Sequence, residues 1–232
     1  MRALLFGLLA FPYVALASPY DRLIDAAAIR HGVDPFVMRA IVQVETGKNP
    51  WSINVDGEGF RFGSAQEAVN ALWQINQNPW LVRIVPHEGR PIRQFFPNET
   101  FARSFLDRYQ RNQMHQGRRT VNIRTDDGKA VAKGEGRVRQ LWMINTDLGI
   151  AQVNYRYHGK SRAYVQRWFD PAFNLDYAAS LVAQHKRKHG DDLRAAGYYH
   201  SATKEHREKY MAKLVPIFHQ EKSNAYPPIA IR

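Results

Sequence analysis

Glu45 is a carboxylate near the end of an otherwise apolar segment, and this position suits acid–base chemistry. The segment 34–46 has the pattern of a helix, because Asp34 is a favourable N-cap, Pro35 suits the first turn and Gly47 favours termination. Glu45 borders the apolar stripe made by Val37, Ile41 and Val44. The negative end of the helix dipole and partial burial both favour a protonated carboxyl group there. The pattern predicts a general acid, with an exposed helical glutamate as the alternative.

Metal and thiol chemistry have little support in the sequence. His185 and His189 are four residues apart in a predicted helix, a spacing that suits a two-histidine metal site. The intervening residues 186–188 are all basic and lack the glutamate of a metalloprotease motif, so we expect a basic helix face and no metal. The absence of cysteine excludes a thiol nucleophile, thiolate metal ligands and a disulfide framework. We expect no cofactor.

The N-terminal segment and the net charge indicate an exported protein with anionic partners. Arg2 precedes an apolar run, and Ala15-Leu16-Ala17 fits the cleavage site of a signal peptide over residues 1–17. An uncleaved anchor is the alternative, but we expect no integral membrane span after cleavage and a periplasmic location. The net charge of +12 favours polyanions, which for an exported chain are cell-wall polymers, acidic peptides and lipid headgroups. Nucleic acid is not an expected partner.

Several elements are predicted around Glu45. Residues 20–32 read as a first helix that forms a hairpin with 34–46. The alternating residues 52–55 precede Asp56-Gly57, which indicates a β-hairpin turn. A capping box at 64–67 opens a further helix. Towards the C-terminus, helical character is expected from Leu148 onward and at 176–190, 193–202 and 205–220, with Pro216 kinking or ending the last helix.

The central part of the chain reads differently. Residues 80–85 resemble a strand, 100–113 a helix, and 120–125 and 129–133 a hairpin around Asp126-Asp127-Gly128. Between residues 103 and 139 there are ten basic and four acidic residues. Such a run usually forms a solvent-exposed charged surface, and the alternative is an insertion that binds an acidic polymer. Nucleic-acid binding here is disfavoured because aromatic residues are sparse.

Two of three separated segments that match one family are Val44-Glu45-Thr46-Gly47 and the run from Asp147 to Asn154. The first resembles the catalytic Glu-Ser motif of the soluble, goose-lysozyme-like family of lytic transglycosylases, and the second resembles that family's Gly-Leu-Met-Gln-Ile-Asn motif. Residues 169–175 and 195–202 resemble the stretch that ends in its Ala-Tyr-Asn-Ala-Gly motif. The order and rough spacing agree.

The resemblance implies a mainly α (α+β) fold class: a lysozyme-like helical domain with a short β-hairpin and a long, partly β insertion. The implied domains are a signal peptide at 1–17, a transglycosylase domain at 18–222 with an insertion at about 60–144, and a flexible tail at 223–232. Glu45 is implied as the catalytic acid and then base. Substrate-binding roles are implied for Thr46, Asn54, Gly149, Ile150, Gln152, Asn154, Tyr199 and His200. The chain departs from the family at Thr46 for serine, Ile150-Ala151 for Leu-Met, His200 for asparagine and Ala202 for glycine.

The implied activity is cleavage of the β-1,4 bond between N-acetylmuramic acid and N-acetylglucosamine in peptidoglycan, with formation of 1,6-anhydro ends. The resemblance is nearest to enzymes that serve type IV secretion, conjugation or pilus systems, which implies an envelope complex as a partner beside the glycan strands. A hydrolase is an alternative if Asp147 or Asp56 positions a water. A non-catalytic peptidoglycan-binding or scaffold protein is the other alternative.

Overall fold

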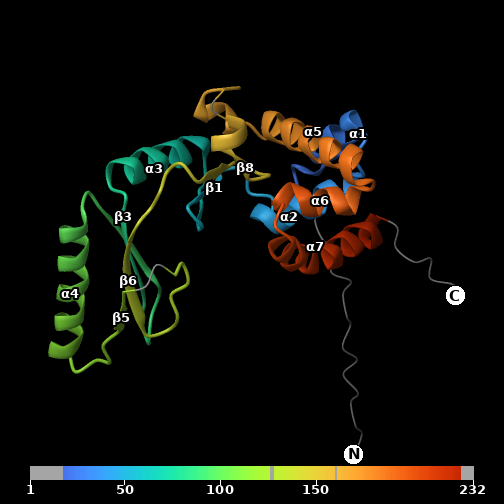
Figure 1. Ribbon diagram of the computed structural model, residues 1–232. Helices are drawn as coiled ribbons and strands as arrows, with labels where there is room; N and C mark the ends of the chain where they lie inside the picture. Colours follow the sequence, from blue (N-terminus) through green and yellow to red (C-terminus); the bar gives the residue numbers. More distant parts are fainter. Residues whose placement is uncertain (1–17, 126–127, 160, 226–232) are drawn as a thin grey trace, which may run out of the picture.

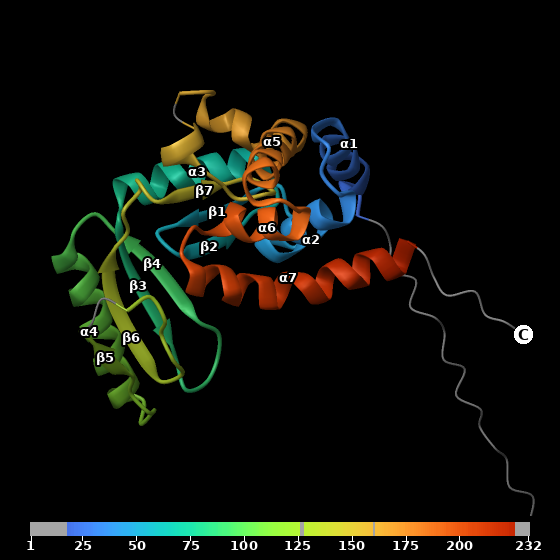
Figure 2. The same cartoon turned by 45° about the vertical axis from the view of Figure 1, so that its right-hand side comes forward.

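The computed structural model describes residues 18–125, 128–159 and 161–225, and these form a mixed α+β fold, as expected. The predicted signal peptide, 1–17, lies outside the described residues. Two units stand side by side in Figures 1 and 2, a mainly helical body and a smaller unit of one sheet and one helix. Each unit has its own cluster of buried apolar side chains.

The helical body is built from segments that lie at the two ends of the sequence. Its helices are α1 (Asp21–His31), α2 (Pro35–Thr46), α3 (Ala65–Gln77), α5 (Pro171–His189), α6 (Asp192–His200) and α7 (Lys204–Ala225). The first five contribute buried apolar residues to one core, together with Tyr210, Leu214 and Phe218 of α7. Ile24, Met38, Ile41 and Leu175 are fully buried in it. The helices before residue 78 and those after residue 170 therefore pack into one unit.

The helix ends follow the signals in the sequence. The side chain of Asp34 accepts a hydrogen bond from the backbone N–H of Phe36 at 2.8 Å, and Gly47 ends α2 with φ 62°. Ser64 caps α3 by accepting from the N–H of Glu67, and the Glu67 carboxylate accepts from the N–H of Gly63, one residue before the partner in the expected capping box. At the start of α5, Asp170 caps Ala172 and Phe173. These capping contacts fix the start of α5 and both ends of α2, and so fix the position of Glu45 near the end of α2.

A small sheet with the strand order β2-β1-β7-β8 borders the helices. Its strands are β1 (Ser52–Val55), β2 (Glu58–Arg61), β7 (Thr146–Leu148) and β8 (Val153–Asn154). The predicted hairpin at Asp56-Gly57 is confirmed, and both turn residues have positive φ. Asn54 pairs with Asp147 across the β1–β7 ladder, and Asp147 pairs with Asn154 across β7–β8. The sheet thus aligns three polar residues from distant segments.

The second unit consists of β3 (Trp80–Val85), β4 (Ile92–Phe96), α4 (Glu99–His115), β5 (Asn122–Arg124) and β6 (Glu135–Gln140). The strand order is β4-β3-β6-β5, and α4 covers one face of the sheet. Its core contains Val82, Ile84, Ala102, Leu106 and Val121. The insertion is therefore partly β, as expected, but α3 buries Ala68, Leu72 and Ile75 in the core of the helical body.

Two sequence predictions in the insertion and the following motif are wrong. The segment 129–133 is not a strand, and β5 pairs with β6 in parallel. Side chains hold the backbone of this segment, since Arg124 donates to the carbonyl of Ala130 and Arg137 to that of Lys129. Residues 126–127, in the predicted turn, lie outside the described residues. Leu148 does not begin a helix, because it ends β7 and its neighbours pair with β1.

The C-terminal helix also differs from expectation. Helix α7 continues through Pro216 to Ala225, three residues into the segment expected to be a tail. Residues 226–232 of that tail lie outside the described residues. Within the described ranges, no helix combines the length and apolar character needed to cross a membrane.

Candidate active site

Glu45 lies in a cleft between the helices and the small sheet. The main part of the cleft, about 440 Å³, is lined by residues of α2, β1, β7, β8, α5 and α6. A second part of about 310 Å³ extends along β1 and β2 towards Phe60 and Arg61. Glu45, Asn54 and Gln152 border both parts. Glu45 therefore stands where the two parts of the cleft meet.

The imidazole of His200 is the basic side chain next to Glu45. Its Nδ1 atom lies 3.5 Å from a carboxylate oxygen of Glu45, whose side chain is 16% exposed. No other basic side chain of the described residues lies within 4.0 Å of that carboxylate. Among the basic side chains of the described residues, His200 alone contacts Glu45.

Tyr210 of α7 packs against His200 beneath the surface of the cleft. Its ring is buried and stacks on the ring of His200, with centroids 4.1 Å apart and planes 5° apart. Its hydroxyl has no partner of ordinary hydrogen-bond geometry among the described residues. Burial and then the charge of Glu45 raise the pKa of this phenol well above its ordinary value. Tyr210 therefore remains a neutral donor directed at the Glu45 region, and sequence patterns gave no sign of it.

Tyr199 lines the cleft from α6, the position that the motif comparison suggested. Its hydroxyl donates a hydrogen bond of 2.6 Å to the backbone carbonyl of Ala151. Burial, and then the negative charges of Glu45 and Asp147, raise its pKa well above the ordinary value. Tyr199 consequently ties α6 to the loop between β7 and β8.

That loop, residues 149–152, has a conformation that only certain residues can adopt. Gly149 has φ 79°, and a Cβ atom there would lie 2.4 Å from both Asn174 Nδ2 and the carbonyl oxygen of Trp168. Gln152 also has positive φ, and its side chain donates to the backbone carbonyls of Ser52 and Gly149. Gln152 is therefore fixed at the junction of the two parts of the cleft.

Buried polar side chains hold the loop from the opposite side. Thr46 donates a hydrogen bond of 2.8 Å to the carbonyl of Ile150. Asn174 accepts from the N–H of Ala151 and donates to the carbonyls of Leu148 and Trp168. Sequence reasoning placed Thr46, Gly149 and Ile150 in contact with substrate. Thr46 and Ile150 are instead buried, none of the three borders the cleft, and they shape its wall from behind.

Asp147 is a second carboxyl group in the cleft. Its side chain accepts a hydrogen bond of 2.8 Å from Asn154, which also borders the cleft. Burial, and to a smaller extent the nearby Glu45, raise the pKa of Asp147 to about 6, although the hydrogen bond from Asn154 opposes this. Asp147 thus changes charge within a moderately acidic range.

The cleft continues past α5, where Tyr157, His158 and His185 line it. Burial is the main cause that lowers the pKa of His158 and of His185, so both imidazoles are mostly neutral at pH 7. His185 stacks on His189, which in turn stacks on Tyr198 at 3.5 Å. Among the described residues no group of three or more metal-ligating side chains gathers.

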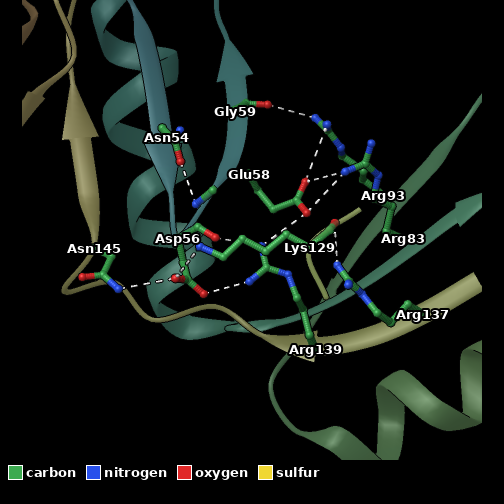
Figure 3. A network of polar contacts seen from close by, with 11 residues as sticks. Asn54, Asp56, Glu58, Gly59, Arg83, Arg93, Lys129, Arg137, Arg139 and Asn145 are labelled. Atoms are coloured by element: carbon green, nitrogen blue, oxygen red, sulfur yellow. Dashed lines mark hydrogen bonds and ion pairs between the residues drawn. The ribbon is translucent and has the colours of Figure 1, made fainter. Parts of the chain in front are cut away.

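The insertion is clamped to the hairpin that carries Asn54. Asp56 and Glu58 of this hairpin are buried and face basic residues of the insertion, as Figure 3 shows. Arg139 contacts both carboxylates, at 2.8 Å to Asp56 and 3.3 Å to Glu58. Arg83 and Arg93 also pair with Glu58. Asp56 is therefore occupied by this ion-pair cluster and borders neither part of the cleft.

Asn54 connects this ion-pair cluster to the cleft. The side chain of Asn54 accepts a hydrogen bond from the N–H of Gly57 and so stabilises the turn that bears Asp56. On its other side Asn54 pairs with Asp147 in the sheet. The insertion thereby holds in place the strand that forms one wall of the cleft.

Comparisons of the chain with protein-family models, with curated proteins and with solved structures gave no match.

Proposed function

We propose that the protein is a peptidoglycan lytic transglycosylase in which Glu45 is the only acid–base group. The observation that supports this proposal is the shared cleft. Glu45 at the end of α2, Gln152 and Asn154 of the central motif, and Tyr199 of the third motif all border it. Glu45 lies more than a hundred positions before the other three residues, and Tyr199 follows Asn154 by 45 positions, so segments far apart in the sequence contribute to one cleft.

The proposed reaction begins with proton transfer from Glu45 to the oxygen that links N-acetylmuramic acid to the next N-acetylglucosamine. The bond from this oxygen to the anomeric carbon breaks, and the substrate's own acetamido group stabilises the positive carbon. Ionised Glu45 then takes the proton of the 6-hydroxyl group as that oxygen bonds to the anomeric carbon. Atoms balance without water, and the intramolecular attack benefits from high effective molarity.

The surrounding side chains suit these steps. The two adjoining parts of the cleft offer space for more than one sugar residue of a glycan, and Glu45 borders both. Asn54, Gln152 and Asn154 offer amide groups for hydroxyl and acetamido groups of the sugars. His200 beside the carboxylate offers a ring nitrogen that can orient Glu45 in both steps.

A lysozyme-type hydrolase is the second candidate, and Asp147 is the observation that favours it. Most glycosidases use two carboxyl groups, and Asp147 borders the same cleft as Glu45. Ionised Asp147 would activate a water molecule, and the product would then carry a reducing end. The alternative based on Asp56 has no support, because Arg139 and Lys129 occupy that carboxylate.

The product of digestion separates these functions. Purified peptidoglycan sacculi digested by the protein should release muropeptides with 1,6-anhydro ends, which are lighter by one water than reducing-end products. Reducing-end products that disappear in Asp147→Asn would support the hydrolase. Binding to sacculi without any release would support a non-catalytic scaffold. Association with a secretion or conjugation complex in the periplasm is part of the proposal and rests on the family resemblance alone.

A further inference from the structure

A second cavity that could accept sugars lies on the insertion, outside the cleft. It has a volume of about 520 Å³ and is bordered by Trp80, Trp142, Glu99, Arg103, Arg139 and Gln140, among others. We call it the tryptophan pocket. Trp80 begins β3 and pairs with Gln140 of β6, and Trp142 follows two residues later. A hydrogen bond from the N–H of Leu141 to the carbonyl of Pro79 holds these two segments together.

We propose that the tryptophan pocket binds neutral N-acetylated sugar residues of a glycan strand. This choice of ligand rests on the proposed function. The first argument is the exposure of Trp142. This residue borders the cavity and is 58% exposed to solvent. The negative face of an indole attracts the C–H groups on the less polar face of a sugar ring, and covering it removes apolar surface from water.

The second argument is that the charged groups of the tryptophan pocket are already paired. Glu99 contacts Arg103 at 2.6 Å, and Asp56 contacts Arg139 at 2.8 Å. Lys129 also faces Asp56, at 3.5 Å. Such pairs offer fixed donors and acceptors without demanding a counter-ion, which suits hydroxyl and acetamido groups better than an anionic polymer. The side chain of Gln140 makes no hydrogen bond with any described residue and remains available to a ligand.

The third argument is the position of the tryptophan pocket next to the cleft. Asp56 borders the pocket, and Asn54, two residues earlier on the same hairpin, borders the cleft. Two residues of extended backbone span roughly 7 Å, which is short compared with the length of a glycan chain. A basic cavity at the far end of the insertion, lined by Arg90, Arg118 and Arg119, lacks such a connection. The insertion thereby extends glycan recognition beyond the cleft.

Tryptophan fluorescence provides a selective test, because neither part of the cleft is lined by a tryptophan. The chain carrying Glu45→Gln is titrated with N-acetylglucosamine oligosaccharides of two to six units, so that binding is measured without cleavage. We expect a saturable change in emission. In the same background Trp142→Ala should abolish this change or weaken binding at least tenfold, and Trp142→Phe should keep binding within about threefold because an aromatic face remains.

Trp73→Ala is the matched control, since Trp73 is 63% exposed on α3 and borders neither the cleft nor the tryptophan pocket. This variant should titrate like its parent. An emission change that survives in Trp142→Ala, or none in the parent, would overturn the proposal, as would a response to polyglutamate alone. Release of muropeptides by the unsubstituted chain is scored separately. A catalytic protein with no tryptophan response would refute the pocket and leave the proposed function intact.

Discussion

Nδ1 of His200 lies 3.5 Å from the carboxylate of Glu45, and the same imidazole stacks on the buried ring of Tyr210. Two adjacent helices, α6 and α7, thus hold one histidine against the carboxylate at the end of α2. In the family that the chain resembles, asparagine is usual at the position of His200. The site therefore places an imidazole beside Glu45 where an amide is expected.

Replacing His200 should slow the proposed reaction without preventing binding. His200→Ala removes the imidazole that contacts Glu45 and leaves the carboxylate less well oriented. We therefore expect kcat to fall about tenfold, equivalent to about 1.4 kcal/mol, with KM little changed. Rates of muropeptide release measure this. His206→Ala, an exposed site on α7, is the control and should match the parent. Equal rates for both variants would show that His200 has no part in turnover.

Asp147 makes stability depend on pH. Its pKa is about 6 in the folded protein and near the ordinary 3.8 in the unfolded chain, so its ionisation favours unfolding. The stabilising contribution is fully present below pH 3.8 and is lost as the pH rises through about 6. Asp147→Asn should therefore be more stable than the parent at pH 7.5, by up to about 3 kcal/mol, with little difference near pH 4.

Urea unfolding of parent and Asp147→Asn at the two pH values measures the effect. Asp107→Asn, on an exposed part of α4, serves as the control and should show no such change with pH. An equal stability difference at pH 4 and pH 7.5 would contradict the assignment of this titration to Asp147.

The loop behind the cleft requires glycine at position 149. In Gly149→Ala the new Cβ would meet Asn174 and Trp168 at 2.4 Å, and the positive φ adds backbone strain. We expect a loss of more than 3 kcal/mol in unfolding free energy, or failure to fold. Gly117→Ala has a similar φ of 64° but open space around the Cβ, and should cost about 1 kcal/mol. Comparable costs for the two variants, measured by urea unfolding, would indicate that crowding at Gly149 is absent.

Arg139 should stabilise the contact between the insertion and the hairpin. Arg139→Ala leaves Asp56 and Glu58 with fewer partners in a buried setting, so we expect a loss of about 3 kcal/mol. Arg103→Ala, in an exposed i,i+4 pair with Glu99, should cost less than 1 kcal/mol. Thermal unfolding compares the two variants, and a small loss for Arg139→Ala would show that the ion-pair cluster adds little to stability.

The parts of the fold that depend on local sequence were predictable. Asp34, Ser64 and the Asp56-Gly57 turn each act on neighbouring residues, and their helices and hairpin appear where expected. The parallel pairing of β5 with β6 was not predictable from local patterns. It depends on side-chain contacts to the segment between these strands, where Arg124 and Arg137 donate to backbone carbonyls.

The candidate site shows the same division. Motif positions identified Glu45, Asn54, Gln152, Asn154, Tyr199 and His200, all of which border the cleft. They could not distinguish a residue on the cleft surface from one behind it, and so placed buried Thr46 and Ile150 among substrate contacts. Tyr210 was missed because helical periodicity shows only that a tyrosine faces inward, and its partner His200 lies on another helix.

The central claim is that Glu45 alone transfers the proton in both steps, and digestion of purified sacculi by Glu45→Gln tests it most directly. Glutamine keeps the size and polarity of the side chain but cannot donate the proton, so we expect release of 1,6-anhydro muropeptides to fall by about 10²–10⁴-fold with an unchanged melting temperature. Asp147→Asn, the matched carboxyl-to-amide change in the same cleft, should keep forming anhydro products. Near-parental release by Glu45→Gln would contradict the account.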